Sequence, residues 1–311
     1  MPHRRFALQD RLAARGLPPA GEAVMAALRD IVDEGVLGAS NHVALALPLV
    51  ARIAADARAG GVAAALETAR FIAETRGAGA PIVANALRWQ TEEVGDEDGE
   101  AGARRLRERA ERWEREAAER RAALVRLAAE RLSDNPAPLL FDYSSTVADV
   151  VKALARTGRL ERLVIPESRA VDGGRRYLEA LAPLGVPCLF LPDAAMEHAV
   201  ARASAVLLGA EGVTLDGGVV NTVGSLPAAR AAAARGVPVY GVADLFKVGR
   251  ERSNETAPRP ERDYPDIVPE GFVGVSTAAP ELELVPPSLV TALLTERGAL
   301  RPAALAAEVA R

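Results

Sequence analysis

The sequence predicts an α/β protein in which a helical N-terminal domain precedes a Rossmann-like, doubly wound domain with a parallel sheet. Two observations lead to this prediction. Up to about residue 134, alanine is abundant and apolar residues recur every three or four positions, which is the period of an amphipathic helix. Beyond that point, short apolar runs alternate with helical stretches, the pattern of a parallel sheet covered on both faces.

The N-terminal domain, residues 1–134, is expected to contain only helices. EAVMAALRDIVDEGV and GGVAAALETARFIAET have helical periodicity, and the acidic VGDEDGE, residues 94–100, is expected to be an exposed loop. The stretch ARRLRERAERWEREAAERRAALVRLAAERL then predicts one long amphipathic helix. Its acids and bases alternate, which favours a solvated face with ion pairs over a nucleic-acid contact.

SDNPAP, residues 133–138, marks the predicted boundary, so that the second domain covers residues 135–311. Five apolar runs are expected to be its parallel strands: PLLFDY, RLVIPES, VPCLFLPD, AVLLGAE and VPVYGVADLF. Helical stretches separate them, the last being LPAARAAAARG. A proline-rich, charged connection, TAPRPERDYPDIVPEG, leads to a last short strand and a helix near PPSLVTALLTERG.

Composition excludes several classes of function. The formal charge of −4 argues against a broad nucleic-acid-binding surface. Cys188 is the only cysteine and the three histidines are scattered, so neither an internal disulfide nor a metal site is expected. No secretory signal, membrane span, dinucleotide motif or P-loop is present. We therefore expect a cytoplasmic protein without a cofactor that contacts neither nucleic acid nor membrane.

The chemistry is expected at the carboxyl ends of the strands, where open parallel sheets bind ligands. Two loops there, with Ser144 and Ser145 and with Gly224 and Ser225, open helices whose free N–H groups and dipoles suit a phosphate. The sequence therefore predicts a site for a phosphorylated small molecule. Its candidate ligand-binding residues are Ser144, Ser145, Arg169, Gly217, Gly218, Asn221, Gly224, Ser225 and Lys247.

Purely structural explanations exist for most of these residues. Helix N-caps would account for the serines or Thr146, a cap or turn for Asp193, and positive φ in a turn for the two glycines at 217 and 218. Arg169 and Lys247 can each be a surface charge, and Cys188 is expected to be inert core. The exception is Glu211, because a carboxylate directly after a core strand is costly to bury unpaired.

Six motifs occur in an order that resembles one family: TRGAGAPIVANALRW, LLFDYSSTV, VIPESRAVDGG, GAEGVTLDGGVVNTVGS, VADLFKV and PPSLVTALLTERG. That family comprises the alpha, beta and delta regulatory subunits of translation initiation factor 2B, methylthioribose-1-phosphate isomerase and ribose-1,5-bisphosphate isomerase. The resemblance implies the same two domains and homodimers or larger homo-oligomers. Arg76 and Asn85 match the first motif, and the resemblance adds Arg76 to the candidate ligand-binding residues.

The family's isomerases use a cysteine in the loop after the first sheet strand and an aspartate in a G-A-D motif. Here Tyr143 stands at the cysteine position, Glu211 at the aspartate position, and Thr222 where N-K-I-G-T has lysine. The G-A-E form is closer to the alpha regulatory subunit. A tyrosine with a pKa near 10 is a poor acid–base partner at neutral pH.

Three hypotheses follow from this resemblance. The first is a protein that binds a phosphorylated sugar or nucleotide without the standard isomerase chemistry. The second is an aldose-1-phosphate to ketose-1-phosphate isomerase, of ribose-1,5-bisphosphate or methylthioribose-1-phosphate type, with Glu211 as base and Tyr143 as acid. The third is an assembly subunit that acts in translation through protein contacts.

Overall fold

The protein is described by a computed structural model that covers residues 4–33, 38–249, 261–264, 267–268, 271–272 and 274–310. The chain forms two compact units, Met1–Glu119 and Arg120–Arg311. The division falls inside a long helix, α6 (Gly99–Arg131), whereas the boundary predicted near residue 134 lies just after this helix.

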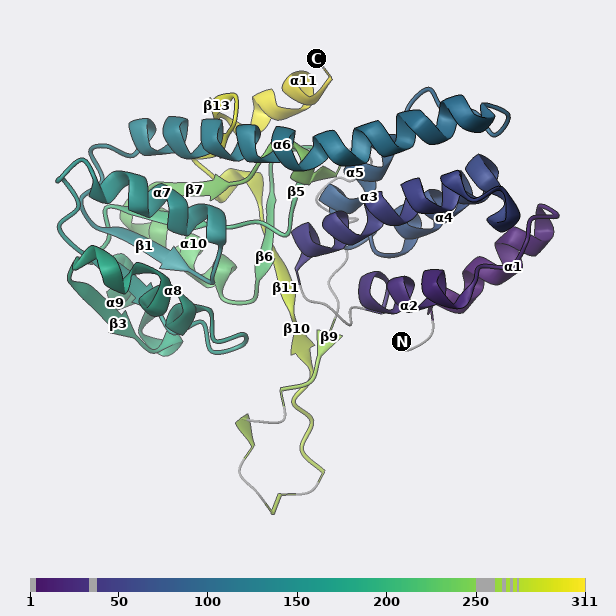
Figure 1. The fold of residues 1–311 in the computed structure, drawn as a ribbon. Helices are drawn as coiled ribbons and strands as arrows, with labels where there is room; N and C mark the ends of the chain where they lie inside the picture. The colour runs from purple at the N-terminus through teal and green to yellow at the C-terminus, as the bar shows by residue number, and fades with distance from the viewer. Residues whose placement is uncertain are drawn as a thin grey trace. The chain divides into compact units, whose positions relative to one another are not determined.

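The first unit is helical throughout its described residues, as the periodicity predicts (Figure 1). Its helices are α1 (Ala7–Ala14), α2 (Glu22–Ile31), α3 (Ala39–Ala55), α4 (Gly61–Thr75), α5 (Pro81–Thr91) and the start of α6, with the short 3-10 turns η1 (Arg4–Phe6) and η2 (Ala57–Ala59). Its core includes one polar link, because Gln90 donates to the carbonyls of Leu47 and Leu106. Trp89 and Trp113 pack with ring centroids 5.5 Å apart, which joins α5 to α6.

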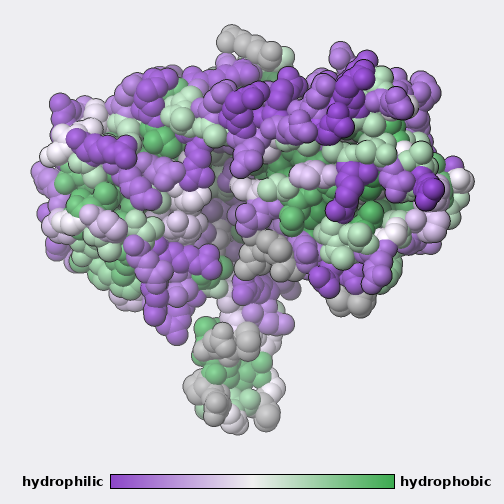
Figure 2. Space-filling model, viewed as in Figure 1, coloured by the Kyte–Doolittle hydropathy of each residue, from purple (hydrophilic) through white to green (hydrophobic). Residues whose placement is uncertain are grey.

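The long helix α6 has the solvated face that its alternating charges predict. Figure 2 shows hydrophilic residues gathered along it. Three ion pairs connect residues four apart, between Arg107 and Glu111, Arg112 and Glu116, and Arg126 and Glu130. Exposed pairs of this kind contribute about 0.3–0.5 kcal/mol each, so packing of the apolar side against its neighbours dominates the helix's stability.

The second unit is a doubly wound α/β domain, which confirms the predicted fold class. Its main sheet has the order β13-β12-β7-β4-β1-β2-β3. The strands are β1 (Pro138–Phe141), β2 (Leu163–Pro166), β3 (Cys188–Leu191), β4 (Ala205–Leu208), β7 (Val239–Val242), β12 (Ala292–Thr295) and β13 (Gly298–Leu300). All neighbours pair in parallel except β13, which forms an antiparallel hairpin with β12.

Alternate side chains of the strands enter two separate cores. Leu139 and Phe141 of β1 pack with α9 (Met196–Val200), α10 (Ser225–Arg235) and α11 (Leu305–Val309). Leu140, between them, packs on the other face with α7 (Ser145–Ala155), α8 (Gly173–Leu181) and the last turns of α6. Helices on both faces explain why the strands read as continuous apolar runs.

A second, smaller sheet was not predicted. It has the order β11-β6-β5-β8, formed by β5 (Gly212–Thr214), β6 (Val219–Thr222), β8 (Val248–Gly249) and β11 (Leu282–Val285). A separate pair joins β9 (Glu261–Arg262) to β10 (Ala279–Pro280). GVTLDGGVVNT is therefore a β-hairpin, and the turn that leads into α10 comes only after β6.

Two further expectations are wrong. The helix expected near PPSLVTALLTERG is instead the short 3-10 turn η8 (Pro287–Leu289) followed by strands β12 and β13, because Leu293 and Leu294 are buried on opposite faces of the sheet. Cys188 is not core: it lies on β3 at the edge of the sheet and is exposed. Much of TAPRPERDYPDIVPEG lies outside the described residues.

Candidate functional site

The main sheet has a topological switch point between β1 and β4. From β1 the chain adds β2 and β3 on one side, then returns to place β4 on the other side of β1. Ligands of open α/β sheets bind in the crevice beyond the carboxyl ends of two such strands. The loops that follow β1 and β4 lie very close together, because a Cβ on Gly209 would be 2.6 Å from the Cβ of Ser144. Glycine is therefore required there.

Asp142, the first residue after β1, is held firmly at this switch point. Its backbone has φ of 56°, its Oδ2 accepts a hydrogen bond from Thr222 Oγ1 at 2.6 Å, and its Oδ1 accepts one from the Tyr143 N–H at 2.8 Å. Burial raises the pKa of Asp142, these two hydrogen bonds oppose the rise, and the nearby charge of Glu211 adds to it. The sequence places Asp142 at the end of the first predicted strand, as it places Glu211 at the end of the fourth, but Asp142 is not among the candidate site residues.

Tyr143 points toward α8 and packs on Tyr177, with ring centroids 5.2 Å apart. The Tyr177 hydroxyl accepts a hydrogen bond from the Ser144 N–H at 3.1 Å, and complete burial raises the pKa of Tyr177. The two tyrosines therefore fix the start of the loop after β1. Ser144 is the N-cap of α7, with its Oγ accepting from the Val147 N–H at 3.4 Å, while Ser145 is exposed in the first turn.

Glu211 and the residue bonded by Lys247, Ala210, are neighbours in the chain at the end of β4. The Glu211 N–H donates to the carbonyl of Val220 at 2.9 Å, which begins the β5–β6 hairpin, and the Glu211 side chain is partly exposed. Lys247 ends the 3-10 turn η5 (Leu245–Lys247), and its Nζ donates to the carbonyl of Ala210 at 2.5 Å. A cation therefore lies beside the peptide that precedes Glu211.

The turn before α10 is closed by internal bonds. Asn221 Nδ2 donates to Ser225 Oγ at 3.0 Å, and Ser225 Oγ donates to the carbonyl of Thr222 at 2.7 Å, with all three residues buried. The N–H groups of Gly224 and Leu226 both donate to Glu283 Oε1 of β11, at 2.6 and 2.7 Å. The N-cap is Gly224, not Ser225, and a carboxylate already binds this helix end.

Gly217 and Gly218 form the turn of the β5–β6 hairpin, at the opposite end of β6 from Thr222. Gly217 has φ of 91°, and the Gly218 N–H donates to Thr214 Oγ1 at 2.8 Å. A Cβ on Gly217 would lie 2.5 Å from Pro302 of the 3-10 turn η9 (Pro302–Ala304). These contacts support the structural explanation for Gly217 and Gly218, namely that the turn itself requires glycine.

Asp193 has the structural role that its position after β3 suggests. In the 3-10 turn η4 (Asp193–Ala195), its two carboxylate oxygens accept from the N–H groups of Ser168 and Arg169, at 2.9 and 2.8 Å. The Arg169 side chain is exposed, 3.8 Å from Glu167. Asp193 thus links the loop after β2 to β3, and Arg169 presents an exposed charge in that loop.

Arg76 belongs to the first unit, whereas the other predicted site residues belong to the second. Its Nε donates to Nδ1 of the fully buried His42 at 2.8 Å, which joins the end of α4 to α3. In the same unit, Arg88 donates to Asn85 Oδ1 at 2.9 Å within α5.

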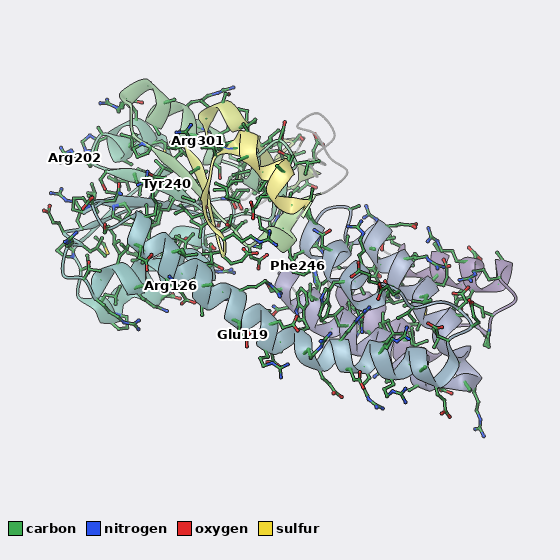
Figure 3. All side chains as sticks on the ribbon, turned by 90° about the horizontal axis from the view of Figure 1, so that it is seen from above. Glu119, Arg126, Arg202, Tyr240, Phe246 and Arg301 are labelled. Atoms are coloured by element: carbon green, nitrogen blue, oxygen red, sulfur yellow. The ribbon has the colours of Figure 1, made fainter. Side chains whose placement is uncertain are left out.

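A second acidic corner lies at the ends of β7 and β12. The Leu245 N–H donates to both carboxylate oxygens of Glu296, at 3.3 and 3.1 Å. Burial raises the pKa of Glu296, and the charge of Asp244 raises it further. Phe246, labelled in Figure 3, lies under the guanidinium of Arg120, whose carbon is 4.3 Å from the ring centroid. The Glu296 carboxylate in this corner is therefore already bonded to the Leu245 N–H.

Within the described residues, no three His, Cys, Asp or Glu side chains come together in a way that could hold a metal ion. Across the same residues, no helix combines the length and the apolar character that a membrane crossing requires.

A family profile described as the initiation factor 2 subunit family matches residues 41–302. The chain is 30% identical over 172 residues to translation initiation factor eIF2B subunit alpha of Caenorhabditis elegans, which covers 55% of this chain and 56% of that protein. It is 27% identical over 240 residues to ribose 1,5-bisphosphate isomerase of Haloferax volcanii, covering 76% and 74%. A methylthioribose-1-phosphate isomerase of Nostoc punctiforme is 31% identical over 169 residues, covering 51% and 48%. With several of these curated relatives, the match thus spans about half of their length.

Solved structures share the fold. A translation initiation factor eIF-2B of Pyrococcus horikoshii superposes with a TM-score of 0.76 at 21% identity, covering 91% of this chain and 98% of that one. The 5-methylthioribose 1-phosphate isomerase of the same organism gives 0.72 at 21% identity, covering 92% and 86%.

Proposed function

This chain belongs to the initiation factor 2 subunit family, and we propose that it binds a phosphorylated sugar or nucleotide at the carboxyl ends of β1 and β4. The observation that supports this most is the switch point itself. It brings together the start of α7, the partly exposed Glu211 and the cation of Lys247. Backbone N–H groups and a cation suit the phosphate, and carboxylates suit sugar hydroxyls.

The proposal excludes the standard isomerase chemistry of the family as the resemblance describes it. That chemistry needs a thiol in the loop after β1, where this chain has Asp142, Tyr143 and two serines. Cys188 is exposed on β3, two strands from β1 across the sheet, and burial of part of its side chain raises the pKa of the thiol. A thiol at that place would need a rearranged sheet to reach the β1 loop.

Titration calorimetry with ribose 1,5-bisphosphate, 5-methylthioribose 1-phosphate and AMP tests the proposal. The chain has only two lysines, which gives a matched pair of variants. Lys247→Met should weaken binding about tenfold, the loss of roughly one charge-assisted hydrogen bond. Lys152→Met is the control. It removes a positive charge on α7, where the Lys152 Nζ lies 3.6 Å from Asp149 Oδ1, and it should leave binding unchanged. If none of the three compounds binds the unaltered protein, the proposal is wrong.

A second candidate is the aldose-to-ketose isomerase. It is favoured by Glu211, an ionisable group at the site with partial access to solvent, and by relatives that carry isomerase names. Conversion of the two pentose phosphates, followed by NMR, separates the candidates. Turnover that Glu211→Gln abolishes would establish the isomerase, whereas binding without turnover would leave the binding function alone.

We also propose that the protein self-associates. One structure with the same fold is described as a tetrameric eIF2B-beta2-delta2 complex from C. thermophilum, with a TM-score of 0.68 at 17% identity. We expect this chain to form a homodimer or a larger homo-oligomer. Light scattering coupled to gel filtration measures the mass, and a monomer of 32.6 kDa at micromolar concentration would contradict the expectation.

A further inference from the structure

Tyr177 is a fully buried tyrosine of α8 that contacts the loop after β1 in two ways. Its hydroxyl oxygen accepts a hydrogen bond from the Ser144 N–H at 3.1 Å, and its ring packs on Tyr143 with a centroid distance of 5.2 Å. The ring contact fixes the side chain of Tyr143. The hydrogen bond is directional, so it also fixes the orientation of the Ser144 peptide.

The helix that carries Tyr177 is held against two strand ends. A Cβ on Gly173 would lie 2.3 Å from Asp142 Oδ1, and a Cβ on Gly174 would lie 2.3 Å from the carbonyl oxygen of Pro166. The start of α8 therefore cannot shift without moving the loops after β1 and β2. Tyr177 is thus a rigid support for the loop after β1.

Ser144 leads into the helix start that the proposed function uses. After it, the N–H groups of Ser145 and Thr146 have no acceptor in the part of the chain that the structure describes. On its other side, a Cβ on Gly209 would be 2.6 Å from the Cβ of Ser144, and the residue after Gly209 has a carbonyl that accepts from Lys247 Nζ at 2.5 Å. Backbone donors and a cation, both suited to phosphate, therefore lie on either side of Ser144.

We propose that Tyr177 is a positioning residue, which holds the Ser144 peptide so that the N–H groups at the start of α7 point toward the phosphate of the ligand. This inference rests on the proposed function, because it names what orients the phosphate contacts of the same site. Tyr177 acts through Ser144 and not by touching the ligand, since its side chain is completely buried. That burial also raises the pKa of Tyr177, so the phenol stays neutral and its effect should be the same at about pH 6 and pH 8.

The alternative is that Tyr177 only fills the core. Tyr177→Phe separates the two roles, because it keeps the ring that packs on Tyr143 and removes the acceptor of the Ser144 N–H. Tyr240→Phe is the matched control. Tyr240 is 2% exposed and packs in the same core, but it lies on β7, two strands from β1.

The first test needs no ligand. Hydrogen exchange of the Ser144 amide, followed by NMR, should be about fivefold faster in Tyr177→Phe than in the unaltered protein, the loss of roughly one neutral hydrogen bond. Tyr240→Phe should leave the exchange rate of Ser144 unchanged. An exchange rate that Tyr177→Phe does not alter overturns the proposal.

The second test adds ribose 1,5-bisphosphate and follows the amide signals of Ser145 and Thr146. Both signals should move when the unaltered protein binds, because their N–H groups donate to the phosphate. In Tyr177→Phe the affinity should fall about fivefold and both shifts should shrink, equally at about pH 6 and pH 8. Tyr240→Phe should behave as the unaltered protein does. A core-filling role alone would lower the free energy of unfolding in urea without changing these shifts.

The outcomes separate the positioning role from the proposed function. If the unaltered protein binds and Tyr177→Phe has the same affinity and the same amide shifts, the positioning role is wrong and the proposed function stands. Binding that leaves both amide signals in place also contradicts the positioning role. Absence of binding to the unaltered protein overturns the proposed function and the positioning role with it.

Circular dichroism confirms that each variant is folded. Replacement of Tyr177 by 4-fluorophenylalanine is the second variant, because it keeps nearly the whole shape of the side chain and puts a poor acceptor in place of the hydroxyl. It should reproduce the faster Ser144 exchange and the weaker binding, and normal values for both would overturn the positioning role.

Discussion

The two helices that the sequence offers as phosphate sites, α7 and α10, begin in different ways. At α7, Ser144 caps its own helix, and no acceptor in the described part of the chain binds the N–H groups of Ser145 and Thr146. At α10, Glu283 of β11 accepts from both Gly224 and Leu226. A loop of small polar residues therefore predicts where a helix starts. Whether the N–H groups at that start are free to bind a ligand depends on distant residues, such as Glu283 of β11.

The starts of α7 and α10 also differ in how closely they are packed. Gly224 has φ of 106°, and a Cβ there would lie 2.2 Å from the ring of the buried Phe141. The start of α10 is thus a packed part of the core beneath β1. The start of α7, with exposed Ser145, is a surface beside the switch point.

Gly224→Ala should have the largest effect, because it breaks the packed start of α10. A left-handed backbone and a clash with a core ring together should cost about 3 kcal/mol of the free energy of unfolding. Gly236→Ala at the other end of α10 has a positive φ of 66° but open space around its Cβ position, and should cost about 1 kcal/mol. Urea unfolding of both variants measures the difference. Equal losses would mean that Phe141 can move aside.

Glu283→Ala should come next, at about 2 kcal/mol, because it leaves two helix N–H groups without their charged acceptor. Glu281→Ala, which removes a partner of Arg262 at 3.3 Å on the surface, should cost less than about 1 kcal/mol. The Glu283 variant also opens the start of α10. If that helix end then binds inorganic phosphate in calorimetry, the two helix starts differ only by this carboxylate; no gain in binding would mean that the turn is closed by its other bonds.

Ser144→Ala should have the smallest effect, about 1 kcal/mol, since it removes one side-chain cap from α7. Ser145→Ala removes no capping bond and should change the free energy of unfolding by a few tenths of a kcal/mol. Thermal unfolding compares the two. A loss at Ser145 as large as that at Ser144 would show that the second serine, and not the first, holds the helix start.

The sequence predicted the layers of the second unit well, because strands buried on both faces leave apolar runs that are easy to see. It also predicted Glu211 and Lys247 at neighbouring strand ends. It failed where a long-range partner decides the outcome. Nothing near Gly224 indicates Glu283, nothing near PPSLVTALLTERG indicates that β7 pairs with its leucines, and nothing near Asp142 indicates Thr222.

The β5–β6 hairpin shows the same limit. Its alternation is short, its turn residues resemble a ligand-binding loop, and only pairing with β11 and β8 makes it part of a sheet. Hairpin pairing thus moves Gly217 and Gly218 to the far end of β6 from Asp142, while it brings Thr222 to Asp142. One pairing decides which residues of GAEGVTLDGGVVNTVGS lie at the switch point.

The exposed edge strand β3 gives the protein a ready attachment point for a spectroscopic label. Cys188 is the single thiol in the sequence, and it faces solvent in a strand whose backbone is fixed by pairing with Leu163 of β2. A fluorophore or spin label can therefore be attached at one known position without any change to the sequence. Labelling should proceed faster at mildly alkaline pH, since the raised pKa of Cys188 keeps it protonated at neutral pH.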